Sequence, residues 1–160
     1  MSETLGGDFA ARLQLVAVGF VLPAGLGVEA AVVLAEDLLA SGLTGPATIR
    51  VASLQRGAIR SEAEQPIREM LAEHGIGVHV PEDEDDKYRL LLTAFGYWGL
   101  PLHSFEGPFY ARIPAWDDQG PLDRSLVMLL DRRDNETRHD AQRSIEDEMR
   151  AVVRAHAPAE

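Results

Sequence analysis

Five consecutive acids, Glu82 to Asp86, are the residues in this sequence whose types and spacing come closest to a metal site. Clustered carboxylates can hold a hard cation such as Ca²⁺, because the ion relieves their mutual repulsion. A calcium loop also needs a turn-forming glycine within the run, and this run has none. Acids at the beginning of a helix instead face the positive end of its dipole, each contributing ~0.3–1 kcal/mol. We therefore expect the run to start a helix, and we predict neither a metal nor another cofactor.

Large aromatic side chains crowd residues 98–116, where they alternate with glycine and proline. Most of these rings are expected in a core, because aromatic residues dominate burial in small domains. Some of them, placed beside acids, would instead make a partner surface, in which rings supply affinity and acids steer the encounter. The predicted surface consists of Asp83, Asp85, Asp86, Tyr97, Tyr110, Trp116, Asp117 and Asp118.

A second interpretation of the same region is a pocket in residues 99–116 that binds a small molecule or a nucleotide. In that case His103, Glu106 and Arg112 would be the candidate acid–base group. Familiar catalytic motifs are missing from the sequence. The five histidines never show the spacing of a zinc protease, and there is no nucleophile elbow, P-loop or cysteine. The sequence thus favours a protein that is not an enzyme and predicts no catalytic residue.

A glycine pattern offers an alternative fold. Gly25, Gly27 and Ala30 open a helix after an apolar run, and residues 47–54 and 77–80 resemble strands. Together they would form a βαβαβ unit with a dinucleotide fingerprint. Pro23 and Ala24 separate the first strand from its glycine, and no acid follows the second strand to bind a ribose. The α/β fold remains the alternative to an all-helical one.

The net charge of −11 argues against nucleic acid and against anionic membranes as partners, because both attract basic surfaces. The excess of acidic over basic residues is larger in the second half, where residues 81–160 hold seventeen acids and ten bases. With 160 residues, 46% of them apolar, the chain can form one domain over residues 1–160, with a frayed tail after about 156. No signal-like start and no apolar run of ~18 residues occurs, so we expect a cytoplasmic protein.

Helical signals recur along the chain. Residues 28–40 carry an apolar stripe that ends at Gly42, and Pro46 can occupy the first position of the next helix. Ser61 and Glu64 suggest a capping box with Pro66 in the first turn, and the same helix would end at Gly75. Further helices are expected after the acidic run, from 104, over 122–130 and over 137–155. The predicted fold is a single all-α domain of about six to seven helices.

The segment 42–76 resembles a pattern that recurs in small all-helical bacterial proteins without an assigned activity. The matching residues are Gly42, Leu43, Pro46, Ala47, Arg50, Ala52, Leu54, Glu62, Ala63, Pro66, Met70, Leu71, Glu73, Gly75 and Ile76. Ser53 stands where those proteins usually have glycine. The resemblance implies an all-helical fold and no particular chemistry.

Charge and motifs together favour a non-enzymatic protein-interaction module that binds a basic partner through its acidic second half. Its most concrete form is an immunity or antitoxin-like protein, because masking the basic active site of a nuclease requires a compact acidic surface. The sequence leaves the partner and the oligomeric state open.

Overall fold

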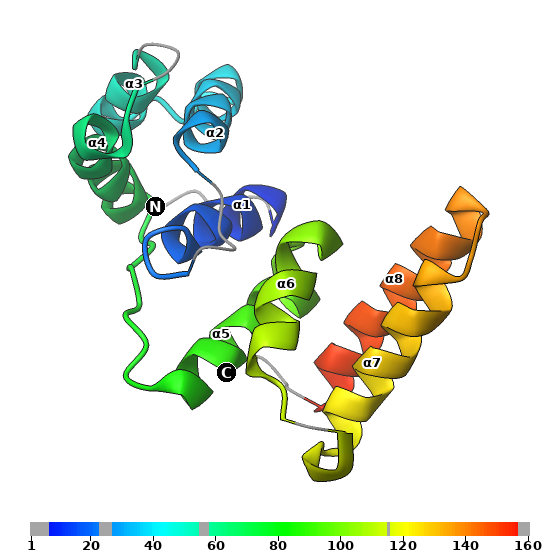
Figure 1. Cartoon of the computed structure of the whole chain (residues 1–160). Helices are drawn as coiled ribbons and strands as arrows, with labels where there is room; N and C mark the ends of the chain where they lie inside the picture. Colours follow the sequence, from blue (N-terminus) through cyan, green and yellow to red (C-terminus); the bar gives the residue numbers. More distant parts are fainter. Residues whose placement is uncertain (1–6, 23–26, 55–57, 115, 157–160) are drawn as a thin grey trace. The chain divides into compact units, whose positions relative to one another are not determined.

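The computed structural model describes residues 7–22, 27–54, 58–114 and 116–156, with only the backbone of Trp116 (Figure 1). The chain divides into two compact units, residues 1–81 and 82–160. The first unit contains α1 (Gly7–Val18), α2 (Val28–Ala40), α3 (Pro46–Ala52) and α4 (Arg60–Glu73). The second contains α5 (Glu84–Tyr97), α6 (Leu102–Arg112), the 3₁₀ helix η1 (Trp116–Asp118), α7 (Pro121–Asp134) and α8 (His139–His156).

The described residues are all-helical, which confirms the predicted fold class and overturns the α/β alternative. They form eight α-helices, more than the six to seven expected. The candidate strand over residues 47–54 instead lies largely in helix α3, and its burial pattern gives the reason. Ala47, Thr48 and Val51 are buried whereas Ile49 is 47% exposed, the spacing of a helix rather than of a strand. Residues 77–80 also form no strand.

Of the proposed dinucleotide fingerprint, Gly25 lies outside the described residues. Gly27 is the N-cap of α2. The prediction of one domain over residues 1–160 stays a prediction beside the two compact units, and the expected frayed tail also lies outside the described residues. No described helix has the length and apolar character needed to span a membrane.

The core of the first unit forms where α2, α3 and α4 pack in succession and α1 packs against α2 and α4. The apolar stripe of each helix faces inward. This packing explains why much of the apolar run before Gly25 forms helix α1 rather than a strand. The buried residues are Leu13, Val16, Ala17, Ala31, Leu34, Ala35, Leu38, Ala47, Val51, Ala63, Ile67, Met70 and Leu71.

Two helices of this unit end at glycines, as predicted. Gly42 and Gly75 have φ angles of +89° and +78°, a left-handed conformation that costs glycine little. The residue after each glycine closes the helix: Leu43 donates its N–H to Leu38, and Ile76 donates to Leu71. These are Schellman motifs, which satisfy carbonyls at the helix ends.

The predicted start of α4 is wrong. The helix begins at Arg60 with Ile59 as its N-cap and without a side-chain cap, so Ser61 forms no capping box. Pro66 consequently lies inside the helix rather than in its first turn. The helix thus begins two residues earlier than a Ser61 cap would place it, and Ala63 lies in the core with an exposure of 0%. The capping pattern of Ser61 and Glu64 in the sequence gives no information about the packing of Ala63.

The N-terminus of α3 is capped by a carboxylate from the end of α4. Glu73 accepts hydrogen bonds from the N–H groups of Ala47 and Thr48, both at 3.0 Å, and from the Thr48 hydroxyl at 2.7 Å. The Thr48 oxygen also lies 2.8 Å from His74 Nε2. Since the hydroxyl proton goes to Glu73, His74 is the donor in that contact. A side chain at position 45 would displace this cap, because its Cβ atom would lie 2.2 Å from the Glu73 carboxyl carbon.

We expect Glu73→Gln to destabilise the first unit by about 1–2 kcal/mol at neutral pH, because charge-assisted hydrogen bonds to the cap are lost. Burial raises the pKa of Glu73, but the hydrogen bonds from Thr48 and Ala47, with His74 nearby, lower it overall below its ordinary value. A carboxyl group with a lowered folded pKa contributes stability above its unfolded pKa and loses it as the pH falls. The difference between wild type and variant should therefore shrink at acid pH.

Amide hydrogen exchange of Ala47 and Thr48 measures this effect at the two bonded groups. The matched control is Glu36→Gln, since Glu36 is an exposed acid of α2 that bonds to no described residue. Equal exchange rates in wild type and the Glu73 variant at neutral pH would show that the carboxylate does not cap α3.

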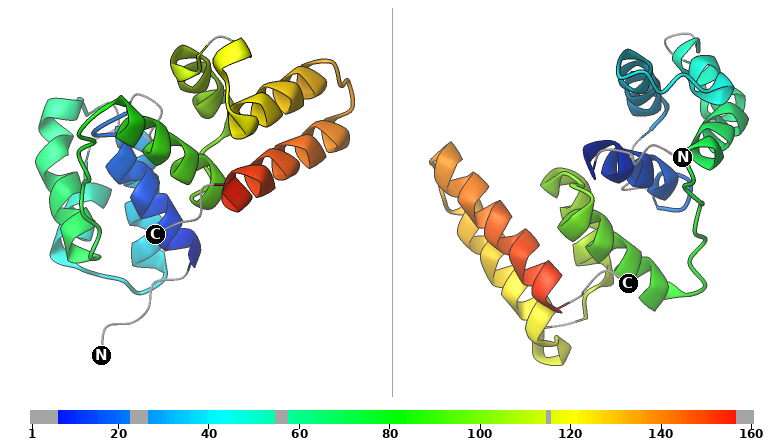
Figure 2. Two further views of the ribbon diagram at one scale, coloured as in Figure 1. Left: turned by 90° about the horizontal axis from the view of Figure 1, so that it is seen from below. Right: turned by 180° about the vertical axis from the view of Figure 1, so that it is seen from behind.

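In the second unit, α7 and α8 lie side by side as an antiparallel pair, and α5 contacts α6 and α8 (Figure 2). Phe95, Phe105 and Phe109 form a continuous stack at its centre, with ring centroids 4.2 and 5.2 Å apart and 0% exposure. Gly96 allows α5 to approach α8, because a Cβ atom there would lie 2.7 Å from Val153 Cγ1. This unit carries most of the predicted site residues.

Candidate functional site

Among the described side chains of the second unit, Tyr110 is the exposed aromatic residue. The α6 residues Phe105 and Phe109 point into the core, so their neighbour Tyr110 lies outside it, with 44% of its surface exposed. Its ring still rests against Phe109, with centroids 5.5 Å apart. A buried neighbour of this kind holds an exposed ring in place, so less side-chain entropy is lost when a partner binds.

The negative charges of three carboxylates act on this tyrosine. Burial raises the pKa of Tyr110, and the negative charges of Glu106, Asp134 and Asp131 raise it further. Glu106 lies one turn earlier on α6, whereas the two aspartates come from the end of α7. We call Tyr110, Glu106, Asp131 and Asp134 the Tyr110 patch. Its phenol stays neutral at physiological pH and keeps a hydroxyl that can donate a hydrogen bond.

The negative charge of the patch is weakly neutralised. Asp131 and Glu106 form no ion pair with any described residue. Asp134 has only Arg133 beside it, at 3.9 Å, and the Arg133 side chain also bonds Glu146 at 2.9 Å. A partner with positive charge can therefore pair with these acids without displacing a strong internal ion pair.

Two arginines of α8 serve the backbone rather than these acids. Arg150 donates to the carbonyls of Phe95 and Leu100, and Arg154 donates to the carbonyl of Gly96 at 2.9 Å. Together they satisfy carbonyl groups at and just after the end of α5, which the helix itself leaves unbonded. The guanidinium groups of these two arginines are thus engaged by backbone carbonyls rather than by the acids of the Tyr110 patch.

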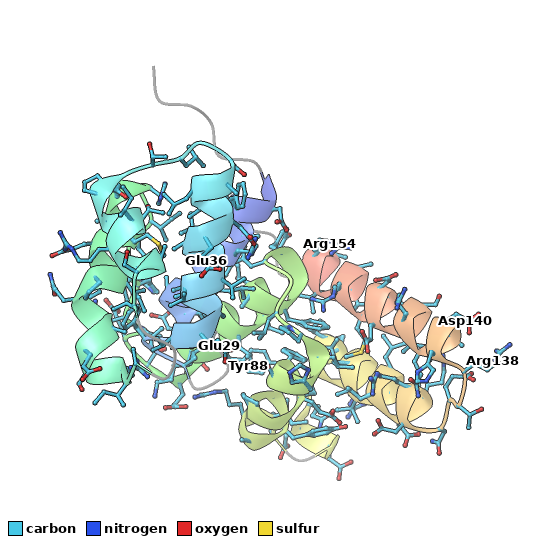
Figure 3. The ribbon with its side chains drawn as sticks, turned by 90° about the horizontal axis from the view of Figure 1, so that it is seen from above. Glu29, Glu36, Tyr88, Arg138, Asp140 and Arg154 are labelled. Atoms are coloured by element: carbon cyan, nitrogen blue, oxygen red, sulfur yellow. The ribbon has the colours of Figure 1, made fainter. Side chains whose placement is uncertain are left out.

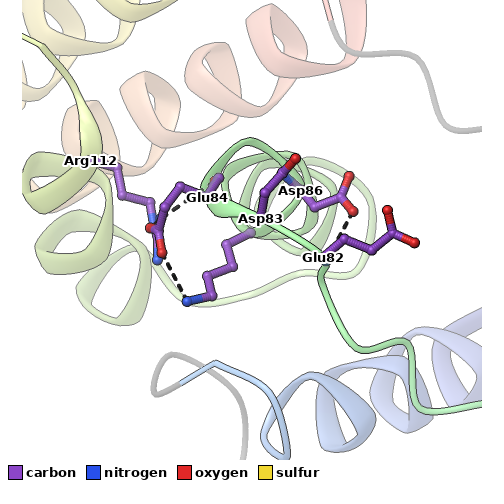
Figure 4. Close-up of polar contacts among 6 residues, drawn as sticks. Glu82, Asp83, Glu84, Asp86 and Arg112 are labelled. Carbon is purple, nitrogen blue, oxygen red and sulfur yellow. Dashed lines mark hydrogen bonds and ion pairs between the residues drawn. The ribbon is translucent and has the colours of Figure 1, made fainter.

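The predicted acidic run begins α5, as expected (Figure 4). Asp83 is the N-cap and accepts the Asp86 N–H at 2.8 Å, and Asp86 in turn accepts the Glu82 N–H at 3.2 Å. Glu84 pairs with Lys87 and Arg112, and these hydrogen bonds lower its pKa. Of the five acids in the run, only Asp85 is exposed and forms no hydrogen bond or ion pair with a described residue. Asp83 and Asp86 therefore have structural roles, which lessens their availability to a partner.

The other predicted surface residues lie on different elements. The Tyr97 hydroxyl, at the end of α5, donates to the Arg154 carbonyl at 3.3 Å. Asp117 and Asp118 are exposed in η1, and the side chain of Trp116 lies outside the described part of the chain. Among described residues, no hydrogen bond or ion pair connects Tyr97, Asp117 or Asp118 with Tyr110. The partner surface as a whole stays a prediction.

The alternative acid–base group is not assembled as a unit. Arg112 pairs with Glu84 rather than with Glu106, and His103 is exposed. No set of three or more His, Asp or Glu side chains within the described residues is arranged to hold a metal ion. Both cavities that we describe are lined by residues of the first unit, not by residues 99–116.

Tyr88 and Asp123 form a pair that the sequence analysis missed. The Tyr88 hydroxyl of α5 donates to the Asp123 carboxylate of α7, and the Tyr88 ring packs edge-on to Phe109 at 6.3 Å (Figure 3). Burial raises the pKa of Tyr88, and the hydrogen bond and charge of Asp123 raise it further. A neutral phenol held in this way joins two helices. No spacing rule relates positions 35 residues apart, so the sequence carried no signal for the pair.

Comparisons of the chain with known proteins found no match. No family model, no curated protein and no solved structure matches the chain. The functional argument consequently depends on the charges, exposure and packing of the residues themselves.

Proposed function

We propose that this protein is an acidic interaction module that binds a basic protein partner through the Tyr110 patch. One observation carries the proposal: an exposed tyrosine rests on the buried Phe109 and feels the negative charges of three acids from two helices. Tyrosine is enriched among the residues that dominate binding energy, and surrounding acids steer a positively charged partner. The proposal narrows the broader surface expected from the sequence and adds Glu106, Asp131 and Asp134 to it.

The concrete form of this proposal is an immunity or antitoxin-like protein that covers a basic active site. In support, the second unit carries seventeen acids and ten bases, and two of its arginines bond to backbone carbonyls. An inhibitor of a nucleic-acid enzyme would present such a surface in place of phosphates. Its partner should lose nuclease activity on mixing with the full chain.

The test begins by capturing partners from native cell extract on the immobilised full chain at low salt. We expect a basic protein that is released as ionic strength rises, because salt screens exposed charges beyond ~10 Å at 0.1 M. Binding of the purified partner is then compared among variants. Tyr110→Ala should weaken it by about thirtyfold, the typical effect of a hot-spot residue. Asp131→Asn should weaken it several-fold and reduce its dependence on salt.

Two variants serve as comparisons. Glu36→Gln removes one exposed acid from α2 in the first unit and should leave binding unchanged (Figure 3). Asp118→Asn tests an acid of η1 that belongs to the surface expected from the sequence alone. The Tyr110 patch is refuted if Asp118→Asn abolishes binding while Tyr110→Ala and Asp131→Asn leave it intact. A partner that is neutral or insensitive to salt would overturn the whole proposal.

A further inference from the structure

A cavity of about 210 Å³ lies in the first unit between α1, α2 and α4. Its lining residues are Val16, Gly19, Phe20, Gly27, Val28, Arg60, Glu64 and Ile67. The floor of the cavity is buried and apolar, because the exposed fraction is 2% for Val16 and 4% for Ile67. An apolar cavity of ~150 Å³ in another protein accommodates benzene, so this one has room for a single ring with a small substituent.

One cation at this cavity has no carboxylate partner. Arg60, the first residue of α4, is exposed and forms no ion pair with any described residue. Its guanidinium lies 5.5 Å from the centroid of the Phe20 ring, a cation–π contact that directs it toward the cavity wall. The positive charge is thus held beside an apolar space and remains available to an anion.

The nearby acid does not cancel this charge. Glu64 lines the cavity, but its carboxylate bonds the Arg68 guanidinium at 3.2 Å. The same guanidinium lies over the Phe20 ring, 4.5 Å from its centroid. Because Glu64 pairs with Arg68, it leaves the positive charge of Arg60 at the cavity without a carboxylate partner among the described residues. This is the opposite sign to the unit as a whole, in which nine acids face five arginines.

The start of α4 adds to the same potential. Its N-cap, Ile59, supplies no side-chain hydrogen bond, so the first N–H groups of the helix are not capped by a side chain. Such a helix start carries partial positive charge and attracts anions. The charge at Arg60 and the apolar floor are thus complementary to a molecule that is negative at one end and apolar at the other.

We propose that this cavity binds a small carboxylate whose apolar body is about the size of a benzene ring. The ring fills the space over Val16 and Ile67, and the carboxylate pairs with Arg60. This binding site belongs to the first unit and is independent of the Tyr110 patch. Loss of either site would leave the other proposal standing.

The test titrates benzoate and its neutral analogue benzamide into the full chain, followed by NMR signals of Val16, Val28 and Ile67. We expect saturable shifts with benzoate and about tenfold weaker binding of benzamide, because a hydrogen bond to a charged group contributes more than a neutral one. Arg60→Gln should weaken benzoate about tenfold and make the two compounds equivalent. Arg50→Gln is the matched control, since Arg50 lies on α3 and pairs with Glu69 outside the cavity.

A second variant tests the cavity itself. Val28→Phe places a larger side chain at the first residue of α2, where it should exclude both compounds. Absence of saturable shifts with either compound would overturn the site. Equal affinity of wild type for benzoate and benzamide, or equal loss in Arg60→Gln and Arg50→Gln, would overturn the role of Arg60.

Discussion

Phe105→Ala is expected to lower the free energy of unfolding of the second unit by about 3–5 kcal/mol, because a large buried ring leaves a cavity that neighbours fill only in part. Phe105 is the middle ring of the stack and contacts both Phe95 and Phe109. Its loss removes the ring that packs α6 against Phe95 of α5. The effect should therefore reach the upper part of the range.

Tryptophan fluorescence during denaturant unfolding measures this loss. Trp98 and Trp116 are the two tryptophans of the chain and both belong to residues 82–160, so the signal reports on the second unit. The matched control is Tyr110→Ala on the same helix. Its ring is 44% exposed, and we expect a loss below about 1 kcal/mol. Similar losses in the two variants would contradict the packing of α6 described above.

Arg150→Ala should destabilise the same unit by about 2–4 kcal/mol, since hydrogen bonds from charged donors contribute ~1.5–3 kcal/mol each and the abandoned carbonyls are partly buried. The guanidinium bonds Phe95 and Leu100 and lies 4.2 Å from the Phe95 ring centroid. It thus ties α8 to the end of α5. Replacement removes the cap and the ring contact together.

Arg150→Lys separates charge from geometry. Lysine keeps the charge but lacks the planar fork that reaches two carbonyls at once, so an intermediate loss is expected. Arg143→Ala is the control on α8, because Arg143 is exposed and bonds to no described residue. The same tryptophan fluorescence gives all three values. If Arg150→Lys unfolds with the same free energy as wild type, the charge at position 150, and not the hydrogen bonds to two carbonyls, stabilises the unit.

Local signals were sufficient for much of the fold. Pro46 marks the start of α3, while Gly42 and Gly75 mark the ends of α2 and α4, because these features depend on backbone conformation within a few residues. The start of α4 was missed, since burial of Ala63 depends on helices elsewhere in the unit. The choice between strand and helix for α3 likewise depended on which side chains face the core.

The candidate site was less accessible from the sequence. Tyr110 stood out as an aromatic residue in an acidic half, and the acidic run was recognised as a helix start. Asp131 and Asp134 were not associated with Tyr110, because they come from another helix, more than 20 residues further along the chain. The arginines that bond backbone carbonyls also have no local pattern, as they lie 50 to 58 residues from their acceptors.

By itself, the sequence determined the glycine stops and the excess of acid in the second half, because each follows from composition or from residues close along the chain. The sequence favoured the all-helical class, and the tertiary structure excluded the α/β alternative. Tertiary structure alone decided the division into two units, the cap from Glu73 on α3, the Tyr110 patch and the cavity beside Arg60. These features join side chains from different helices. Their energies depend on burial and on charges brought together by packing, which spacing along one chain does not encode.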